Sequence, residues 1–167
     1  SNESMTETSP VTETAVAGFP IPWLAIPGWS ERFGVVAGVT GRGAADDPFD
    51  LGLASEQPTV RVLDRWRQLR SAFPRFPGMV VARQVHQATV LWHDRADGWT
   101  IHEGADGHAT ATAGLLMAVS LADCVPIYLV DPRRRAVALL HSGWRGTAAN
   151  ILRAAVGVLS LQAGSRP

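Results

Sequence analysis

The stretch that decides the fold begins at Ala122-Asp123-Cys124-Val125-Pro126-Ile127 and ends at His141-Ser142-Gly143-Trp144-Arg145-Gly146. It contains two apolar runs, residues 126–130 and 136–140, separated by Asp131-Pro132-Arg133-Arg134-Arg135. Aspartate and proline are strong turn formers, and both apolar runs have the length of strands. The stretch therefore predicts two antiparallel strands joined by a hairpin.

The hairpin also predicts which residues face each other. If Asp131 pairs with Ala136, the numbers of paired residues sum to about 267, which places Cys124 opposite Gly143. Paired Cα atoms on antiparallel strands lie about 4.5–5.5 Å apart, so a shift of one or two residues still keeps His141 within reach of Cys124. That proximity suits either a thiolate–imidazole pair or two ligands of one metal ion.

Outside the hairpin, strands and helices interleave without a strict βαβ order. Strands are predicted at residues 34–40, 79–85, 89–92 and 114–120. Apolar residues spaced by three and four predict an amphipathic helix over residues 59–73: Val60, Leu63, Trp66, Leu69 and Phe73. The pattern indicates an α+β fold, with a layered mixed β-sheet and flanking helices.

The other segments are assigned from their composition. A second helix is predicted over residues 146–161, with Thr147 as its N-cap and Gly164 beyond its end. The polar segment 93–108 is interpreted as a loop, and residues 19–29, which contain several prolines, as an extended arm. Residues 1–17 are rich in Ser, Thr and Glu and are predicted to form a disordered tail. Residues 18–167 are then predicted to form a single domain.

Composition excludes several classes of function. Fifteen basic residues balance fifteen acidic ones, which gives no overall field that favours nucleic acid. No apolar run reaches the roughly 18–20 residues that cross a bilayer, so no membrane partner is expected. The single cysteine cannot form an intrachain disulfide. Such a cysteine is typical of cytoplasmic proteins, which use it as a nucleophile or a metal ligand.

A zinc site is one interpretation of Cys124 and His141, and it needs a third ligand. His86, at the end of a predicted strand, is a better candidate than the histidines of segment 93–108. Three protein ligands would leave one position open, as in catalytic zinc sites. Alternatively, His86 caps its strand or faces solvent, and Cys124 acts as the nucleophile of a hydrolase with His141 as its base.

Two arginines are candidates for binding an anion. Arg145 follows Gly143 at a predicted helix start, where free N–H groups and the guanidinium would attract phosphate. The alternative is a simple helix-entry turn in which Trp144 belongs to the core. Arg42 lies between Gly41 and Gly43, so it either lines a pocket or is solvated.

Three blocks of sequence carry a family resemblance. Arg83-Gln84-Val85-His86, Ala122-Asp123-Cys124-Val125-Pro126 and His141-Ser142-Gly143-Trp144-Arg145-Gly146-Thr147 together resemble the polyphenol oxidase laccase domain family. That family is now regarded as purine nucleoside phosphorylases with adenosine deaminase side activity. The resemblance implies the laccase-domain fold, which is similar to that of cysteine hydrolases. It also implies a catalytic zinc held by His86, Cys124 and His141, with Arg42 lining the active site.

The chain departs from the family pattern in several places. Gly41 separates Thr40 from Arg42, Gln87 replaces a glycine and Ser142 replaces an alanine, but no implied ligand is lost. Family members continue further, so a fragment, a homo-oligomer or a complementing chain is expected. Copper is disfavoured, because the chain has five histidines and no methionine placed as an axial ligand.

Three hypotheses follow for the function. The first is a zinc enzyme acting on purine nucleosides, in which Arg42 and Arg145 hold phosphate while Arg42 and Cys124 serve catalysis. The second is a Cys–His hydrolase or amidase that needs no metal. The third is a truncated, non-catalytic homologue that binds zinc for stability or partner binding.

Overall fold

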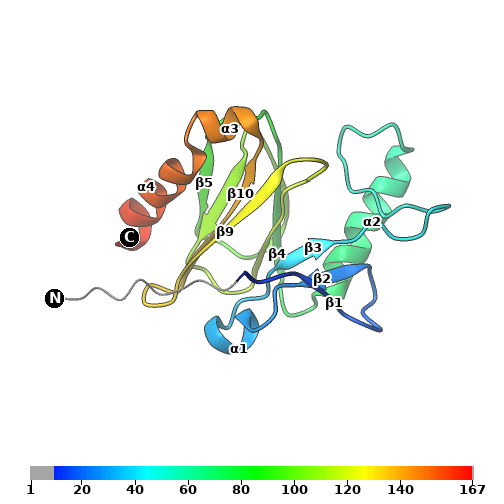
Figure 1. Ribbon diagram of the computed structural model, residues 1–167, viewed down its shortest axis with the longest axis horizontal. Helices are drawn as coiled ribbons and strands as arrows, with labels where there is room; N and C mark the ends of the chain where they lie inside the picture. Colours follow the sequence, from blue (N-terminus) through cyan, green and yellow to red (C-terminus); the bar gives the residue numbers. More distant parts are fainter. Residues whose placement is uncertain (1–9, 167) are drawn as a thin grey trace. The chain divides into compact units, whose positions relative to one another are not determined.

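The computed structural model describes residues 10–166. Its elements follow in this order (Figure 1): β1 Thr14–Ala15, β2 Trp23–Ala25, α1 Trp29–Phe33, β3 Gly38–Thr40, α2 Thr59–Ala72, β4 Gly78–Arg83, β5 Val90–His93, β6 Gly98–Glu103, β7 Gly107–Thr110, β8 Leu115–Met117, β9 Val125–Asp131, β10 Ala136–Ser142, α3 Trp144–Ala148 and α4 Ile151–Ala163. The chain divides into two compact units, residues 1–49 and 50–167. The elements form an α+β fold, as predicted.

The first unit contains an antiparallel sheet in the order β1-β2-β3. The predicted arm 19–29 contains β2. The predicted strand 34–40 is shorter in the structure and consists of β3 alone. Thr14–Ala15, within the segment 1–17 that was predicted to be disordered, pairs with Leu24 and Ala25. Strand pairing uses main-chain groups, so a polar composition does not prevent it. Residues 1–9 lie outside the described part of the chain.

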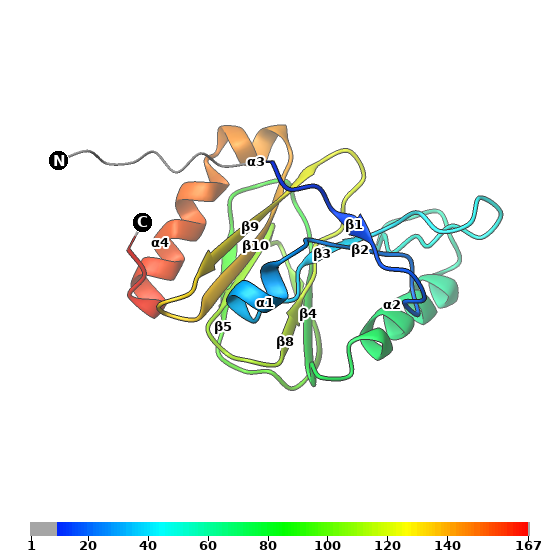
Figure 2. The ribbon, with the colours of Figure 1, turned by 60° about the horizontal axis from the view of Figure 1, so that its bottom comes forward.

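The second unit contains two sheets within its described residues. One is parallel, in the order β6-β4-β8, and the other is mixed, in the order β5-β7-β10-β9. The β9–β10 hairpin has the predicted register, from Asp131 opposite Ala136 to Ser142 opposite Val125. Figure 2 shows the two strands side by side, with α3 at the end where β10 finishes.

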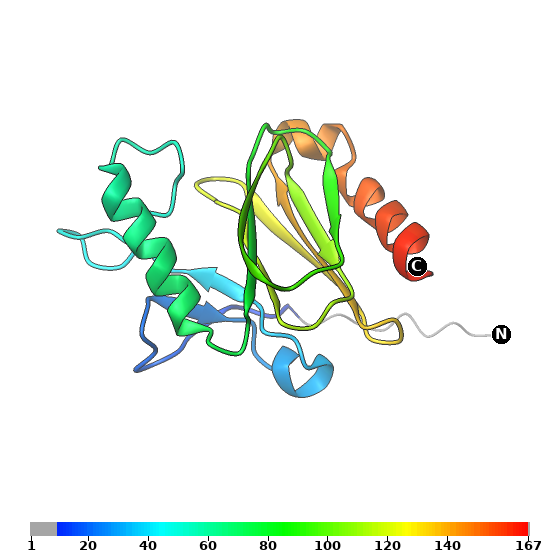
Figure 3. The ribbon, with the colours of Figure 1, turned by 180° about the vertical axis from the view of Figure 1, so that it is seen from behind.

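Two helices of the second unit bury apolar faces. The face of α4 that contains Ile151, Ala155 and Leu159 packs on the mixed sheet. Figure 3 shows α4 beside this sheet from behind. In α2 the predicted helix is confirmed, but its buried face is displaced from the predicted one. Val62, Arg65, Trp66 and Leu69 are buried, whereas Val60 is 63% exposed. The ring of Trp66 on this buried face packs against that of Trp99 in β6, with ring centroids 6.3 Å apart.

Two segments differ from their predicted structure. The predicted loop 93–108 contains β6 and the first two residues of β7, because these segments pair as strands with β4 and β5, which are distant in sequence. The predicted helix 146–161 is broken into α3 and α4 at Asn150, which has a left-handed conformation with φ of 59°. The Asn150 side chain caps α4 by accepting a hydrogen bond from the N–H of Arg153, so Thr147 is not its N-cap. Gly164 ends α4 as predicted.

The described helices include none with the length and apolar character needed to cross a bilayer.

Candidate metal centre

The structure brings together His86, Cys124 and His141. One ligand atom from each lies within 4.8 Å of those from the other two. Cys124 and His141 reach each other through the hairpin, and His86 comes from the segment after β4 in the parallel sheet. The rings of His86 and His141 meet edge to face, with centroids 4.9 Å apart. The predicted cluster therefore combines residues from segments that belong to two different sheets.

Exposure increases across the cluster. His141 is 3% exposed, Cys124 is half-buried and His86 is exposed. The cluster is therefore closed on the side of β10 and open to solvent on the side of His86. A small molecule could reach the three side chains from that open side.

Gly143 leaves room beside all three side chains. A Cβ atom at this position would lie 3.0 Å from the Sγ of Cys124, 3.5 Å from the Cδ2 of His86 and 4.0 Å from the Cε1 of His141. Its φ of −80° is open to any residue, so the reason for glycine here is space rather than backbone conformation. Glycine preserves a cradle that a larger side chain would fill.

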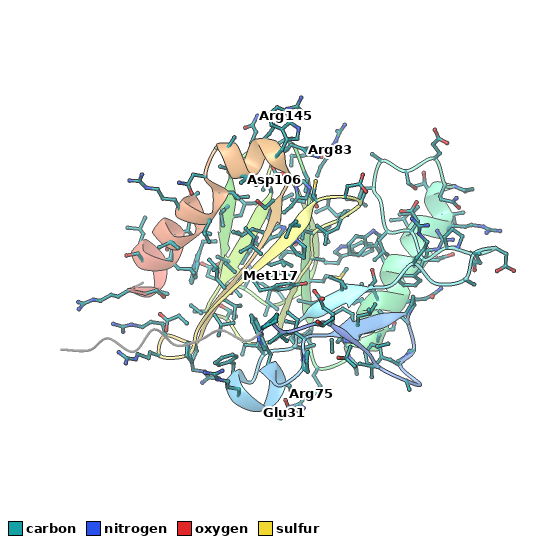
Figure 4. All side chains as sticks on the ribbon, viewed as in Figure 1. Glu31, Arg75, Arg83, Asp106, Met117 and Arg145 are labelled. Carbon is teal, nitrogen blue, oxygen red and sulfur yellow. The ribbon has the colours of Figure 1, made fainter. Side chains whose placement is uncertain are left out.

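Asp106 lies beneath the cluster and was missed by the sequence reasoning. It is fully buried, and Figure 4 shows it inside the sheet below Arg145. Its Oδ1 accepts hydrogen bonds from the Nδ1 of His141 at 2.9 Å and from the N–H of His86 at 2.8 Å. Its Oδ2 accepts from the N–H groups of Val85 and Gln87 at 3.2 and 2.9 Å. The acidic residue sits in a polar, glycine-containing segment, which gives no sequence signal of burial.

The charge of Asp106 is maintained by these donors. Burial by itself raises the pKa of the Asp106 carboxyl, but the hydrogen bonds from Gln87, His141, Val85 and His86 outweigh it and lower the pKa below its usual value. The ionised carboxylate can therefore orient the imidazole of His141. With Nδ1 engaged, Nε2 is the nitrogen of His141 left to bind a metal ion.

Gln84 links the segment of His86 to that of Cys124. Its amide group donates from Nε2 to the carbonyl of Ser120 at 2.9 Å and accepts at Oε1 from the N–H of Ser120 at 2.6 Å. This pair of hydrogen bonds holds the start of the loop that leads to Cys124. Its contribution was also missed, because a glutamine in a strand end is usually a surface residue.

The donor set fits a metal ion. Two imidazoles and a thiolate are ligands that zinc accepts in a tetrahedral site, and three protein ligands leave a fourth position for water or substrate. A carboxylate behind a ligating histidine is the usual partner of such a ligand in metal sites. The three side chains and the carboxylate of Asp106 behind His141 therefore suit the binding of a borderline-soft divalent ion.

The two predicted anion-binding arginines lie in different units. Arg145 is exposed in α3, with its guanidinium carbon 4.9 Å from the ring centre of Trp144. Trp144 is 76% exposed, so its alternative interpretation as a core residue is wrong. Because α3 has only five residues, it offers a small part of the dipole of the long helix that was predicted. Arg42 is exposed in the first unit, where its carbonyl accepts a hydrogen bond from Phe49.

Comparison with known proteins finds related sequences and structures. The chain is 40% identical over 132 residues to the purine nucleoside phosphorylase YlmD of Geobacillus stearothermophilus, a match that covers 71% of this chain and 48% of that protein. It is 43% identical over 85 residues to the adenosine deaminase RL5 of an unknown prokaryotic organism, covering 47% of this chain and 32% of that protein. The crystal structure of YlmD from G. stearothermophilus superposes with a TM-score of 0.82 at 29% identity, covering 95% of this chain and 62% of that chain.

The chain spans about half the length of the curated relatives it matches. A family model described as multi-copper polyphenol oxidoreductase laccase matches residues 34–167, which include the candidate ligands and the elements that carry them. The chain therefore belongs to this laccase family, as the three sequence blocks predicted.

Proposed function

We propose that the chain binds zinc through His86, Cys124 and His141 and acts on purine nucleosides. The proposed reactions are phosphorolysis of adenosine or inosine to the base and ribose 1-phosphate, and deamination of adenosine. The observation that carries the proposal is the convergence of two imidazoles and a thiolate over a buried carboxylate. Relatives named as purine nucleoside phosphorylases and an adenosine deaminase support the substrate class.

Some residues of the proposed site would bind the metal ion and the substrate, and others orient the metal ligands. A zinc ion, when bound, supplies Lewis-acid activation of an oxygen nucleophile. Asp106 holds His141 in place, and the closed side of the cluster at His141 keeps solvent from that face. The open side at His86 admits the substrate. Arg145, two residues beyond Gly143, offers an exposed guanidinium for a phosphate, and Arg42 is proposed to do the same.

The two proposed reactions differ in the bond that breaks. In phosphorolysis a phosphate oxygen bonds to the ribose anomeric carbon, and the purine leaves with the electron pair of the C–N bond and takes up a proton. In deamination water adds to C6 of adenine and the amino group leaves as ammonia. Both need an oxygen nucleophile positioned against the substrate, which a site with one open ligand position can provide.

The test combines metal analysis with product analysis. Purified chain is assayed for bound metals and for turnover of adenosine and of inosine with phosphate, with bases and ribose 1-phosphate separated by chromatography. His86→Ala should lose both zinc and turnover. The matched control His102→Ala, a half-buried histidine outside the cluster, should keep both.

Other outcomes would favour the other hypotheses. Turnover that survives zinc removal, with Cys124 alkylated by iodoacetamide whether or not zinc is present, would support the Cys–His hydrolase. Stoichiometric zinc without turnover would support a non-catalytic homologue. Light scattering on the same samples tests the proposed homo-oligomer. A reduced cysteine as a metal ligand favours a cytoplasmic location, which is part of the proposal.

A further inference from the structure

Four N–H groups converge on the two carboxylate oxygens of Asp106. Three are consecutive main-chain groups, from Val85, His86 and Gln87, and the fourth is Nδ1 of His141. The main chain of Asp106 is held as well, since its N–H donates to the carbonyl of Thr89 at 3.0 Å and its carbonyl accepts from the N–H of His141 at 2.7 Å. Hydrogen bonds therefore hold both oxygens of the carboxylate and the main chain on either side of it.

The main chain of His86 needs this support. Its φ of 59° lies in the left-handed region, which is uncommon for residues other than glycine. This conformation turns the chain after β4 so that successive N–H groups point at the same carboxylate. Such a turn persists when its surroundings hold it, and here the two oxygens of Asp106 bind the residues before, at and after the turn.

The same carboxylate determines the tautomer of the neutral His141 ring. Because Oδ1 accepts from Nδ1, the neutral imidazole carries its proton on Nδ1 and leaves the lone pair of Nε2 free. That lone pair is the one a metal ion requires. A single oxygen atom thus serves the main chain of one candidate ligand and the ring of another.

We propose that Asp106 is a positioning residue that holds the main chain of His86 and the ring of His141 together in their ligating arrangement. The inference rests on the proposed metal site and is independent of which reaction that site performs. Asp106 itself does not bind the metal ion. It holds two separate candidate ligands in the positions they need before the metal ion binds.

Asparagine cannot replace the carboxylate. Its amide offers one acceptor oxygen and one NH₂ group, whereas all four groups around Asp106 are donors. With the NH₂ toward Val85 and Gln87, it opposes two main-chain N–H groups. With the NH₂ toward His86 and His141, it opposes one N–H and favours the His141 tautomer that carries its proton on Nε2. The first orientation disturbs the turn that carries His86, and the second disturbs His86 and His141 directly.

The first test uses the unaltered protein without metal. The chain is labelled with ¹⁵N-histidine, and the tautomer of His141 is read from its ring nitrogen shifts near pH 7.5. The expected result is a proton on Nδ1 and a bare Nε2. A proton on Nε2 with a bare Nδ1 would overturn the inference, and this measurement does not depend on whether any variant folds.

The second test compares Asp106→Asn with Thr110→Val. Thr110 is 2% exposed on β7, and its hydroxyl donates to the carbonyl of His93 at 2.7 Å and accepts from the N–H of Thr112 at 2.9 Å. T110V therefore also loses hydrogen bonds of a buried side chain but lies outside the cluster. Zinc affinity is measured by competition with a chromophoric chelator, and cobalt is used as a spectroscopic probe. D106N should bind zinc about 10–100-fold more weakly, with a changed cobalt spectrum, while T110V keeps both.

The outcomes separate this inference from the proposed function. Equal zinc affinity of D106N and the unaltered chain would overturn the positioning role, whatever the turnover. A selective loss of zinc by D106N would support it even if no purine nucleoside is converted, and in that case only the proposed reaction fails.

Discussion

Gly143 lies directly against Cys124, and a Cβ atom on Gly143 would sit 3.0 Å from the thiol sulfur. The contact continues the β9–β10 register by one residue beyond the pair Ser142–Val125. The hairpin therefore does more than bring a histidine close to the cysteine. It also places a residue without a side chain where the three candidate ligands need space.

Gly143→Ala should weaken metal binding more than it weakens folding. The backbone conformation suits alanine. The added methyl group, however, moves the Sγ of Cys124 by a few tenths of an ångström, away from its position relative to His86 and His141. We expect a change in unfolding free energy of about 1 kcal/mol or less in the metal-free protein. Zinc affinity should fall by about tenfold, measured by chelator competition, since tenfold corresponds to about 1.4 kcal/mol.

The matched control for that variant is Gly157→Ala in α4. Nothing lies within 4 Å of a Cβ atom there, and alanine is favoured over glycine in a helix by about 0.5–1 kcal/mol. G157A should stabilise the chain and leave zinc affinity unchanged. If G143A and G157A bind zinc equally well, the space beside Cys124 has no role in metal binding.

Gln84→Glu should loosen the segment that carries Cys124. The carboxylate can still accept from the N–H of Ser120, but it faces the carbonyl of Ser120, to which Gln84 donates. The variant loses this hydrogen bond and places a carboxylate oxygen against the carbonyl oxygen of Ser120. Together these effects should lower the unfolding free energy by about 1–3 kcal/mol. Zinc affinity should fall too. Gln68→Glu, on the exposed face of α2, is the control, and a Q84E protein with the zinc affinity of Q68E would contradict this role for Gln84.

Stability should decrease as the pH falls below about 6.5 because of two buried histidines. Burial, followed by the charge of His102, lowers the pKa of His93 to about 4, with a small opposing effect from Asp94. Burial, followed by His93 and His102, lowers the pKa of His108 to about 3. Both rings have an ordinary pKa of 6.5 once unfolded, so the unfolded chain binds more protons in this range.

The stabilising effect of these neutral rings is complete above pH 6.5 and is lost as the pH approaches 4 and then 3. Urea unfolding of metal-free protein at several pH values between 7.5 and 4.5 measures it. His93→Gln removes one of the two groups, and its unfolding free energy should depend less steeply on pH. An unchanged slope in H93Q would show that acid sensitivity arises elsewhere.

Asn150 should contribute to stability through both its backbone and its side chain. Asn150→Ala loses the hydrogen bond to the N–H of Arg153 and places alanine in a left-handed conformation, so a cost of about 1–2 kcal/mol is expected. Asn150→Gly also loses the cap but tolerates this conformation, and should cost less. Thermal or urea unfolding ranks the variants. N150G less stable than N150A would contradict this account.

The sequence alone contained the information for the hairpin and for the three candidate ligands. Asp131 and Pro132 define the turn, and the pairing of Asp131 with Ala136 then determines every further pair up to Ser142 and Val125. Gly143 comes next to Cys124 directly after that pair. The amphipathic helix α2 was also predictable, since its apolar spacing is local. Local patterns of this kind are visible because the periods of strands and helices appear directly in the order of residues.

Only the tertiary structure decided what supports those ligands. Asp106 is completely buried, yet its segment has the composition of a loop. A buried carboxylate of this kind is satisfied by partners that are distant in sequence. Gln84 acts on a carbonyl and an N–H 36 residues away. The periodicity of apolar residues in a sequence predicts which of them are buried. It does not predict hydrogen bonds between segments that are distant in sequence. The candidate ligands could therefore be found from sequence, whereas the buried carboxylate that contacts two of them could not.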